Sequence, residues 1–147
     1  MAMTRDKVWL WAHEAGSHNR WTNLPGVSRI APAEAARSLG IHNVIMVAFG
    51  NRPEPPFHAH ALPLAAMRRL VWSIVGDASS PRSDLDAVLD LASSMPNLCG
   101  GIMDDFFQRD PATGKPGRTT PAEVAAFASR LHDGPRRLDL WVVLYDH

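Results

Sequence analysis

The stretch Asn43-Val-Ile-Met-Val-Ala-Phe49 decides the fold class of this 147-residue chain. Its apolar residues follow one another without the polar alternation of a strand that has one face in water. The run is shorter than a typical helix and contains β-branched Val and Ile, so we interpret it as a β-strand. A strand that is apolar on both faces is typical of a parallel sheet covered on both sides.

Four further apolar runs have a similar length and ending, and they are rich in Val, Ile and Trp. They are residues 8–12, 70–75, 98–103 and 138–145. Segments of helical character separate the five runs, namely residues 32–39, 62–69, 83–95 and 120–132. The first of these ends at Gly40, a residue suited to a helix C-terminus, and the last opens with the capping-box pair Thr120 and Glu123. This alternation predicts βαβ units with right-handed crossovers.

The predicted fold class is α/β: a partial (β/α)8 (TIM) barrel with about five parallel strands and four helices, or alternatively an open parallel sheet. The turn at residues 13–19 lacks the G-x-G-x-x-G pattern of dinucleotide-binding open sheets, and acidic strand ends favour the barrel. A complete barrel needs roughly 250 residues. We therefore expect residues 1–147 to form a single domain, an incomplete barrel truncated after the fifth strand. A half-barrel that dimerises and a small open sheet complete in itself are the alternatives.

Charge and hydropathy exclude two classes of partner. Lys and Arg number 15 and Asp and Glu number 15, so the basic excess of a nucleic-acid-binding protein is missing. The apolar run at residues 8–12 is too short for a signal-peptide core or a membrane span. We expect a cytoplasmic protein that binds neither nucleic acid nor membrane. A single cysteine, Cys99, excludes an internal disulfide, and its apolar surroundings predict a buried, inert thiol.

Acidic residues follow four of the five apolar runs, and the carboxyl ends of parallel strands meet at one edge of a sheet or one mouth of a barrel. Asp104 and Asp105, at the fourth strand end, are the leading catalytic candidates, and Glu14 and Asp77 are the others. Adjacent residues of an extended strand point to opposite sides, so we expect one of the two aspartates to face the mouth. Packed like charges can keep one carboxylic acid protonated for general-acid work.

Further polar and aromatic residues near the strand ends are candidates for substrate binding. Trp21 stands out because it lies in a long loop rather than in a strand, where a sugar ring can stack on it. The full set is His13, His18, Asn19, Trp21, Asn51, Ser79, Arg82, Phe106, Tyr145, Asp146 and His147. The strand tryptophans, Trp9 and Trp11 among them, are expected to pack in the core.

The histidines form no recognised metal motif. His13-Glu14 is followed by Ser17 where H-E-x-x-H requires histidine. His58-x-His60 has a metal-motif spacing, but it lies in the proline-rich segment 50–61, which we interpret as a loop. We therefore predict no cofactor and no metal site from motifs. A divalent ion held by scattered side chains is the alternative, and the candidate ligands are His13, Glu14, Asp77 and Asp104.

The run Gly100-Gly-Ile-Met-Asp-Asp-Phe-Phe107, together with the strand-end acids, resembles the N-terminal half of a TIM-barrel protein of glycoside-hydrolase type. The resemblance implies a carbohydrate ligand and a catalytic or sugar-binding carboxylate at Asp104 or Asp105. Our leading hypothesis is a carbohydrate-active barrel protein, or an inactive piece of one, with Asp104 or Asp105 as the general acid. In this hypothesis Glu14, Asp77 or Asp146 is the second carboxylate or accepts hydrogen bonds from sugar hydroxyls. Two other functions remain open: a metal-dependent sugar or sugar-phosphate isomerase or lyase, and a non-catalytic binding or assembly module.

The first and fifth strands of such a partial barrel have no neighbour on one side. Both are strongly apolar and carry few of the lysines or prolines that protect edge strands. We therefore predict that the chain self-associates through its open sheet edges.

Overall fold

The computed structural model describes residues 4–21, 26–75, 83–106, 114 and 119–144. The strands are β1 (Trp9–Ala12), β2 (Asn43–Met46), β3 (Arg69–Ser73), β4 (Leu98–Met103) and β5 (Asp139–Val142). The helices are α1 (Pro32–Leu39), α2 (His58–Ala61), α3 (Leu85–Ser94) and α4 (Pro121–His132), with short 3-10 turns η1 (Thr4–Lys7) and η2 (Leu62–Leu64). The strands form one sheet in the order β1-β2-β3-β4-β5, and all neighbours are parallel. The expected α/β fold with five parallel strands and four helices is confirmed.

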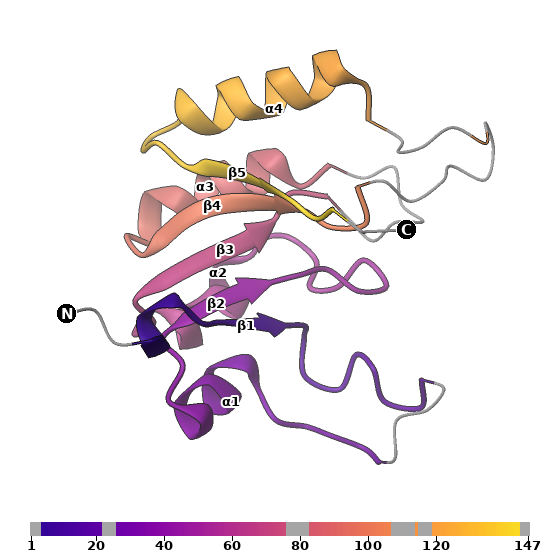
Figure 1. The fold of residues 1–147 in the computed structure, drawn as a ribbon, viewed down its shortest axis with the longest axis vertical. Coiled ribbons are helices and arrows are strands. Elements are labelled where there is room, and N and C mark those ends of the chain that lie inside the picture. The colour runs from indigo at the N-terminus through magenta and orange to yellow at the C-terminus, as the bar shows by residue number, and fades with distance from the viewer. Residues whose placement is uncertain (1–3, 22–25, 76–82, 107–113, 115–118, 145–147) are drawn as a thin grey trace.

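The two faces of the sheet carry separate hydrophobic clusters. Buried residues of the helices, such as Ala36, Val88 and Leu131, pack against strand residues such as Leu70 and Leu98. The opposite face has a cluster built from strands and strand ends alone, with Ile45, Val47, Val71 and Ile102 at its centre. Helices therefore cover one face, as right-handed crossovers between sequential strands require. Barrel walls share this strand order, while in the described residues the sheet is open at β1 and β5 (Figure 1).

The helix-free face is strongly concave. The rings of Trp9 on β1 and Trp141 on β5 meet edge to face with centroids 4.9 Å apart, although three strands separate them in the sheet. In a flat sheet, four strand spacings would put β1 and β5 roughly 19 Å apart. The curvature brings the two edge strands toward each other, and the paired indoles help to cover the apolar cluster beneath. The guanidinium of Arg69 lies 4.5 Å from the centre of the Trp9 ring.

Gly100 on β4 makes room for this contact. A Cβ at position 100 would lie 2.9 Å from two atoms of the Trp141 indole and 2.8 Å from the carbonyl oxygen of Asp139. The glycine therefore allows β5 and its tryptophan to approach β4 closely.

The helix that we expected at residues 62–69 is wrong in position. The α-helical turn α2 comes earlier, within the segment interpreted as a loop, and it passes into the 3-10 turn η2. Pro63 explains the change, because it has no N–H to donate to the α-helical bond pattern. Arg69 already belongs to β3, and the N–H of Arg68 donates to the carbonyl of His42 at 2.8 Å.

Two predicted helix ends are confirmed, while α3 begins and ends slightly inside the predicted range 83–95. Gly40 terminates α1 in the left-handed conformation, with φ of 63°. Thr120 and Glu123 form a capping box at the start of α4, with the side chain of each bonded to the backbone N–H of the other. Arg130 of α4 pairs with Asp86 of α3, which joins the two helices. Among the helices that the structure describes, none is long and apolar enough to span a bilayer.

Candidate functional site

The carboxyl ends of the strands surround a cleft of about 530 Å³, which we call the strand-end cleft. Its lining residues come from β1 and the loop after it, from the segments after β2 and β4, and from the end of β5. They are Trp11, His13, His18, Trp21, Phe49, Asp104, Asp105 and Val143. The cleft thus brings together His13, His18, Trp21, Asp104 and Asp105 from the sequence-predicted set.

Strand periodicity explains how these side chains reach one cleft. Side chains two residues apart in a strand share a face. Trp11 and His13 continue the face of Trp9, while Phe49 continues that of Ile45 and Val47. Asp104 and Val143 extend in the same way the faces of Ile102 and Trp141. The cleft is therefore the polar end of the concave, helix-free face.

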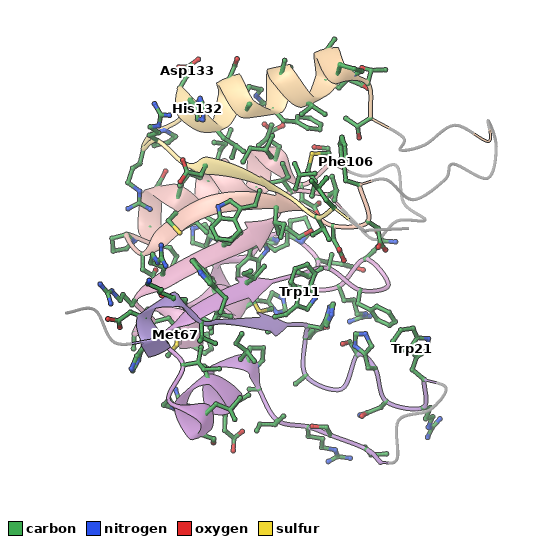
Figure 2. The ribbon with its side chains drawn as sticks, in the orientation of Figure 1. Trp11, Trp21, Met67, Phe106, His132 and Asp133 are labelled. Carbon is green, nitrogen blue, oxygen red and sulfur yellow. The ribbon has the colours of Figure 1, made fainter. Side chains whose placement is uncertain are left out.

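Four rings form a contiguous aromatic group on one side of the cleft. The imidazole of His18 stacks on Phe49 with centroids 3.9 Å apart and planes inclined by 29°. The indole of Trp21 meets His18 at 5.0 Å and Phe49 at 5.5 Å, both edge to face. His13 lies 4.4 Å from His18 between ring centroids. Figure 2 shows Trp11 on β1 and Trp21 farther out, on the loop that follows.

A tight turn presents Phe49 to this group. Phe49 and Arg52 exchange two backbone hydrogen bonds, of 3.0 and 3.1 Å. The two residues between them, Gly50 and Asn51, have φ of 58° and 59°, the left-handed values that such a two-residue turn requires. Asn51 therefore shapes the turn, and it does not line the strand-end cleft.

His13 is held in one tautomer. Its Nδ1 lies 3.1 Å from the carbonyl oxygen of Val47, and since a carbonyl can only accept, Nδ1 carries the hydrogen. The Nε2 lone pair is then left as a proton acceptor. Burial of the ring, and next the neighbouring His18, lower the pKa of His13, while the bond to Val47 opposes the shift. The fold thus favours the neutral imidazole, which is the form a general base requires.

Asp104 and Asp105 differ from the extended-strand expectation. β4 ends at Met103, and the two aspartates lie in the turn that follows. Asp105 has a left-handed backbone, with φ of 49°, and its N–H donates to Oδ1 of Asp104 at 2.8 Å. The turn breaks the alternation that would send adjacent side chains to opposite sides. Both residues therefore line the same cleft, whereas we expected only one.

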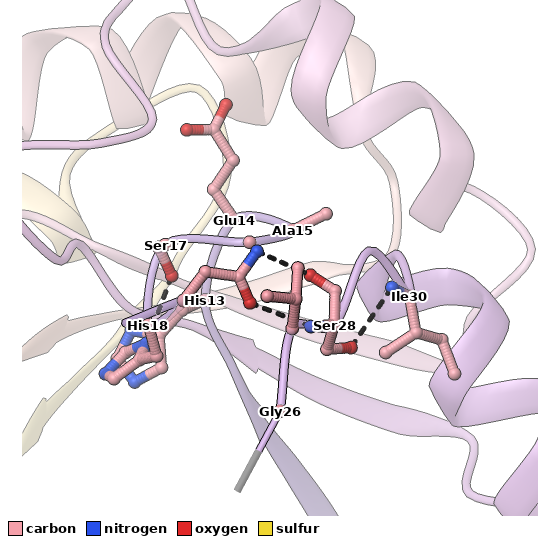
Figure 3. A pocket seen from close by; sticks show the side chains of 11 residues that line it. His13, Glu14, Ala15, Ser17, His18, Gly26, Ser28 and Ile30 are labelled. Atoms are coloured by element: carbon pink, nitrogen blue, oxygen red, sulfur yellow. Dashed lines mark hydrogen bonds between the residues drawn. The ribbon is translucent and has the colours of Figure 1, made fainter. Parts of the chain in front are cut away.

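Glu14 and Asn19 line a neighbouring pocket of about 460 Å³ in the loop after β1 (Figure 3). The amide of Asn19 donates to the carbonyl of Ser28 at 2.9 Å and accepts from its N–H at 2.8 Å, which holds the loop closed. The Glu14 carboxylate is directed away from the imidazoles of His13 and His18 in this view. It lies instead 3.5 Å from Nδ1 of His60. Glu14 is therefore not gathered with Asp104 and Asp105.

The remaining predicted residues fall into two groups. Phe106, predicted to bind substrate, instead packs against the core on the helix-covered face, and the aromatic rings of the cleft come from β1, the loop after it and the segment after β2. The others lie outside the described residues, and their roles stay predictions: Asp77, Ser79, Arg82, Tyr145, Asp146 and His147.

Sequence reasoning missed Trp11, Phe49 and Val143 as cleft residues. We assigned Trp11 to the core, but 41% of its surface is exposed. The spacing Trp9, Trp11, His13 was the available signal, because it puts an indole on the same face as a functional histidine. When a strand is apolar on both faces, its sequence does not indicate which face is left uncovered by helices.

The divalent-ion site that we considered as an alternative has no ligand cluster in the described part of the chain. No three His, Cys, Asp or Glu side chains gather there as ligands for an ion. One member of the expected set, Asp77, lies outside those residues.

Cys99 is half-buried rather than fully buried as we expected, while its environment is that of an inert thiol. Its Sγ–H donates to the carbonyl of Leu70 at 3.3 Å, and burial, the largest influence, raises the pKa of the thiol. A thiol whose pKa is raised forms little of the reactive thiolate.

Comparisons of the chain with protein-family models, with curated proteins and with solved structures gave no match. The resemblance in the run at residues 100–107 is therefore not extended by a detectable relative. The structure shows the architecture of the chain, a five-stranded, all-parallel α/β sheet, and no family is identified.

Proposed function

We propose that the strand-end cleft binds a carbohydrate and that the protein is a carbohydrate-active, glycoside-hydrolase-like barrel protein. One observation carries the proposal: a wall of aromatic rings and the adjacent carboxylates Asp104 and Asp105 line a single cleft of about 530 Å³. This volume lies within the range of roughly 300–1,000 Å³ typical of small-molecule sites.

The chemistry of the lining suits a sugar. A pyranose ring has an apolar C–H face that packs on aromatic rings, and the indole of Trp21, 55% exposed beside Phe49, supplies such a surface. Its hydroxyl groups need strong acceptors, which the carboxylates of Asp104 and Asp105 provide. The neutral His13 adds a further acceptor.

Hydrolysis of a glycosidic bond requires a proton donor to the leaving oxygen and a second group acting as nucleophile or base. In the proposal, Asp104 or Asp105 donates the proton. The second group is the other member of this pair, or Asp77 or Asp146. Glu14 is not used, since its carboxylate lies against His60.

Binding is tested with a panel of disaccharides of gluco, galacto and N-acetylglucosamine configuration, followed by tryptophan fluorescence. We expect at least one to bind, and Trp21→Ala to weaken its binding about tenfold or more. Leu62→Ala, on an exposed apolar side chain of η2 outside the cleft, is the control and should bind normally. If no sugar of the panel binds, the proposal fails.

Turnover is tested with nitrophenyl glycosides of the configuration that binds. Asp104→Asn or Asp105→Asn should reduce the rate by about 100-fold or more, since each removes a proton-transfer group. Asp90→Asn, on the exposed surface of α3, should have no effect. Sugar binding without any turnover would identify a non-catalytic carbohydrate-binding module and refute the hydrolase half of the proposal.

A further inference from the structure

A second cavity, of about 220 Å³, lies on the helix-covered side of the sheet, and we call it the α1–α2 pocket. Its walls come from the start of α1, from α2 with η2 and from the end of β2. Ala33, Met46 and Leu64 form its buried apolar part, with exposed fractions of 3%, 3% and 2%. Its interior can therefore receive an apolar group without leaving polar atoms unpaired.

Two ionisable side chains, Glu14 and His60, stand in the wall of this pocket. Oε1 of Glu14 lies 3.5 Å from Nδ1 of His60, and the side chains are 30% and 38% exposed. The other lining residues are apolar: Ala15, Ala31, Pro32, Ala33, Met46, Pro53, Ala59, Pro63 and Leu64. An apolar pocket with one acid–imidazole pair is the pattern of a binding site that accepts an apolar body with one polar end.

The sign of the charge at this site follows from its neighbours. The start of α1 contributes the partial positive charge of a helix N-terminus, and Glu34 in its first turn offsets that charge. Among the residues that the structure describes, the Glu14 carboxylate faces one ionisable partner, an imidazole that is positive only when protonated. A cationic ligand end can replace that partner, whereas an anionic end would meet the carboxylate with repulsion.

We infer that the α1–α2 pocket is a binding site for a small primary ammonium ion with an apolar body, its ammonium group on Glu14 and its body against Met46 and Leu64. Size supports a single ring, because a dry cavity of about 150 Å³ already accepts benzene. A cavity of about 220 Å³ has room for a ring and a one-carbon arm. The site is independent of the strand-end cleft, which neither Glu14 nor His60 lines.

The experiment uses three probes of one shape: benzylammonium, benzyl alcohol and benzoate. Binding is followed at pH 7.5 through the methyl resonance of Met46, with the buried Met67 outside the pocket as internal control. We expect benzylammonium to shift Met46 and not Met67, with a dissociation constant of about 1 mM or below. Benzyl alcohol should bind at least tenfold more weakly, and benzoate not measurably. Equal binding of the ammonium and the alcohol, or no shift of Met46, would overturn the inference.

Variants separate recognition by Glu14 from non-specific binding in the pocket. Glu14→Gln should weaken benzylammonium at least tenfold, and Glu54→Gln, on an exposed glutamate outside the pocket, should not. His60→Gln should keep or strengthen binding, because it removes the competitor for the carboxylate. Ala59→Leu should block the pocket, while Ala66→Leu, on an exposed residue that does not line it, should have no effect. Equal losses in Glu14→Gln and His60→Gln would contradict the assignment.

Discussion

Gly100 is the residue on which the closest approach of β4 and β5 depends. A Cβ there would lie within 2.9 Å of the Trp141 indole and 2.8 Å of a backbone oxygen. Because the backbone oxygen cannot move aside as a side chain can, Gly100→Ala should destabilise the fold by roughly 1–3 kcal/mol, the usual cost of overpacking. Urea denaturation followed by tryptophan fluorescence measures this loss.

Gly26→Ala is the matched control for Gly100, because a Cβ at position 26 would meet nothing within 4 Å. Its unfolding midpoint should stay near that of the unchanged chain. Equal midpoints for the two variants would show that β5 does not approach β4 as closely as described.

His13 should make stability depend on pH. The pKa of its imidazole is lowered in the folded state, by burial first and by His18 second. Since the unfolded chain then binds the proton more tightly, this contribution is complete above the ordinary histidine pKa of about 6.5 and is lost as pH falls from there through the lowered value. The unfolding midpoint in urea should therefore decrease between pH 7.5 and pH 5.5.

The variant His13→Gln isolates this contribution, because glutamine retains a donor for the Val47 carbonyl but does not titrate. The pH dependence should become shallower in this variant. His132→Gln, on an exposed histidine of α4, should leave it unchanged. If His13→Gln and the unchanged chain lose stability in parallel, the pH dependence does not come from His13.

Among the elements, α4 depends most visibly on a local sequence signal. The hydroxyl of Thr120 accepts from the N–H of Glu123 at 3.2 Å, and the Glu123 carboxylate accepts from the N–H of Thr120 at 2.7 Å. Thr120→Ala removes the first bond and should lower the thermal midpoint by roughly 2–4 °C. Thr120→Ser should retain it. A calorimetric scan distinguishes the two, and equal losses would mean that the cap is not formed.

The elements also show how far sequence reasoning reaches. Capping residues and apolar periodicity located α1, α3, α4 and the five strands, because each of these signals acts over only a few residues. The segment 62–69 was misassigned because Pro63 shifted the helical turn toward the N-terminus and pairing with β2 drew Arg69 into a strand. Pairing between strands is a long-range effect, and a single segment does not reveal it.

The candidate site was predictable only in part. Strand ends identify His13, Asp104 and Asp105, because topology alone brings them to one edge. The direction of Glu14 toward His60 depends on the path of a loop and on the position of α2, and neither has a local signature. The shared cleft of Asp104 and Asp105 likewise depends on the left-handed backbone of one residue.

At the scale of the whole molecule, self-association through the two edge strands stays a prediction. β1 and β5 each have one side without a strand neighbour in the described sheet. Apolar edges of this kind pair readily with other chains. We expect size-exclusion chromatography to show a concentration-dependent increase in apparent mass, and Val142→Lys on the β5 edge to reduce it. A constant monomeric mass at all concentrations would show that the curved sheet protects its own edges.

The contact between Trp9 and Trp141 also has a consequence for the order of folding. Each βαβ unit closes a short loop, but the two indoles come from opposite ends of the described sheet. Bringing Trp9 and Trp141 together closes a much longer stretch of chain, which costs more chain entropy. This cost is offset only after the intervening strands have paired. The edge-to-face indole pair should therefore form last in refolding. Its exciton signal in circular dichroism, which needs two closely spaced indoles, would then appear after the helical signal and time the final curving of the sheet.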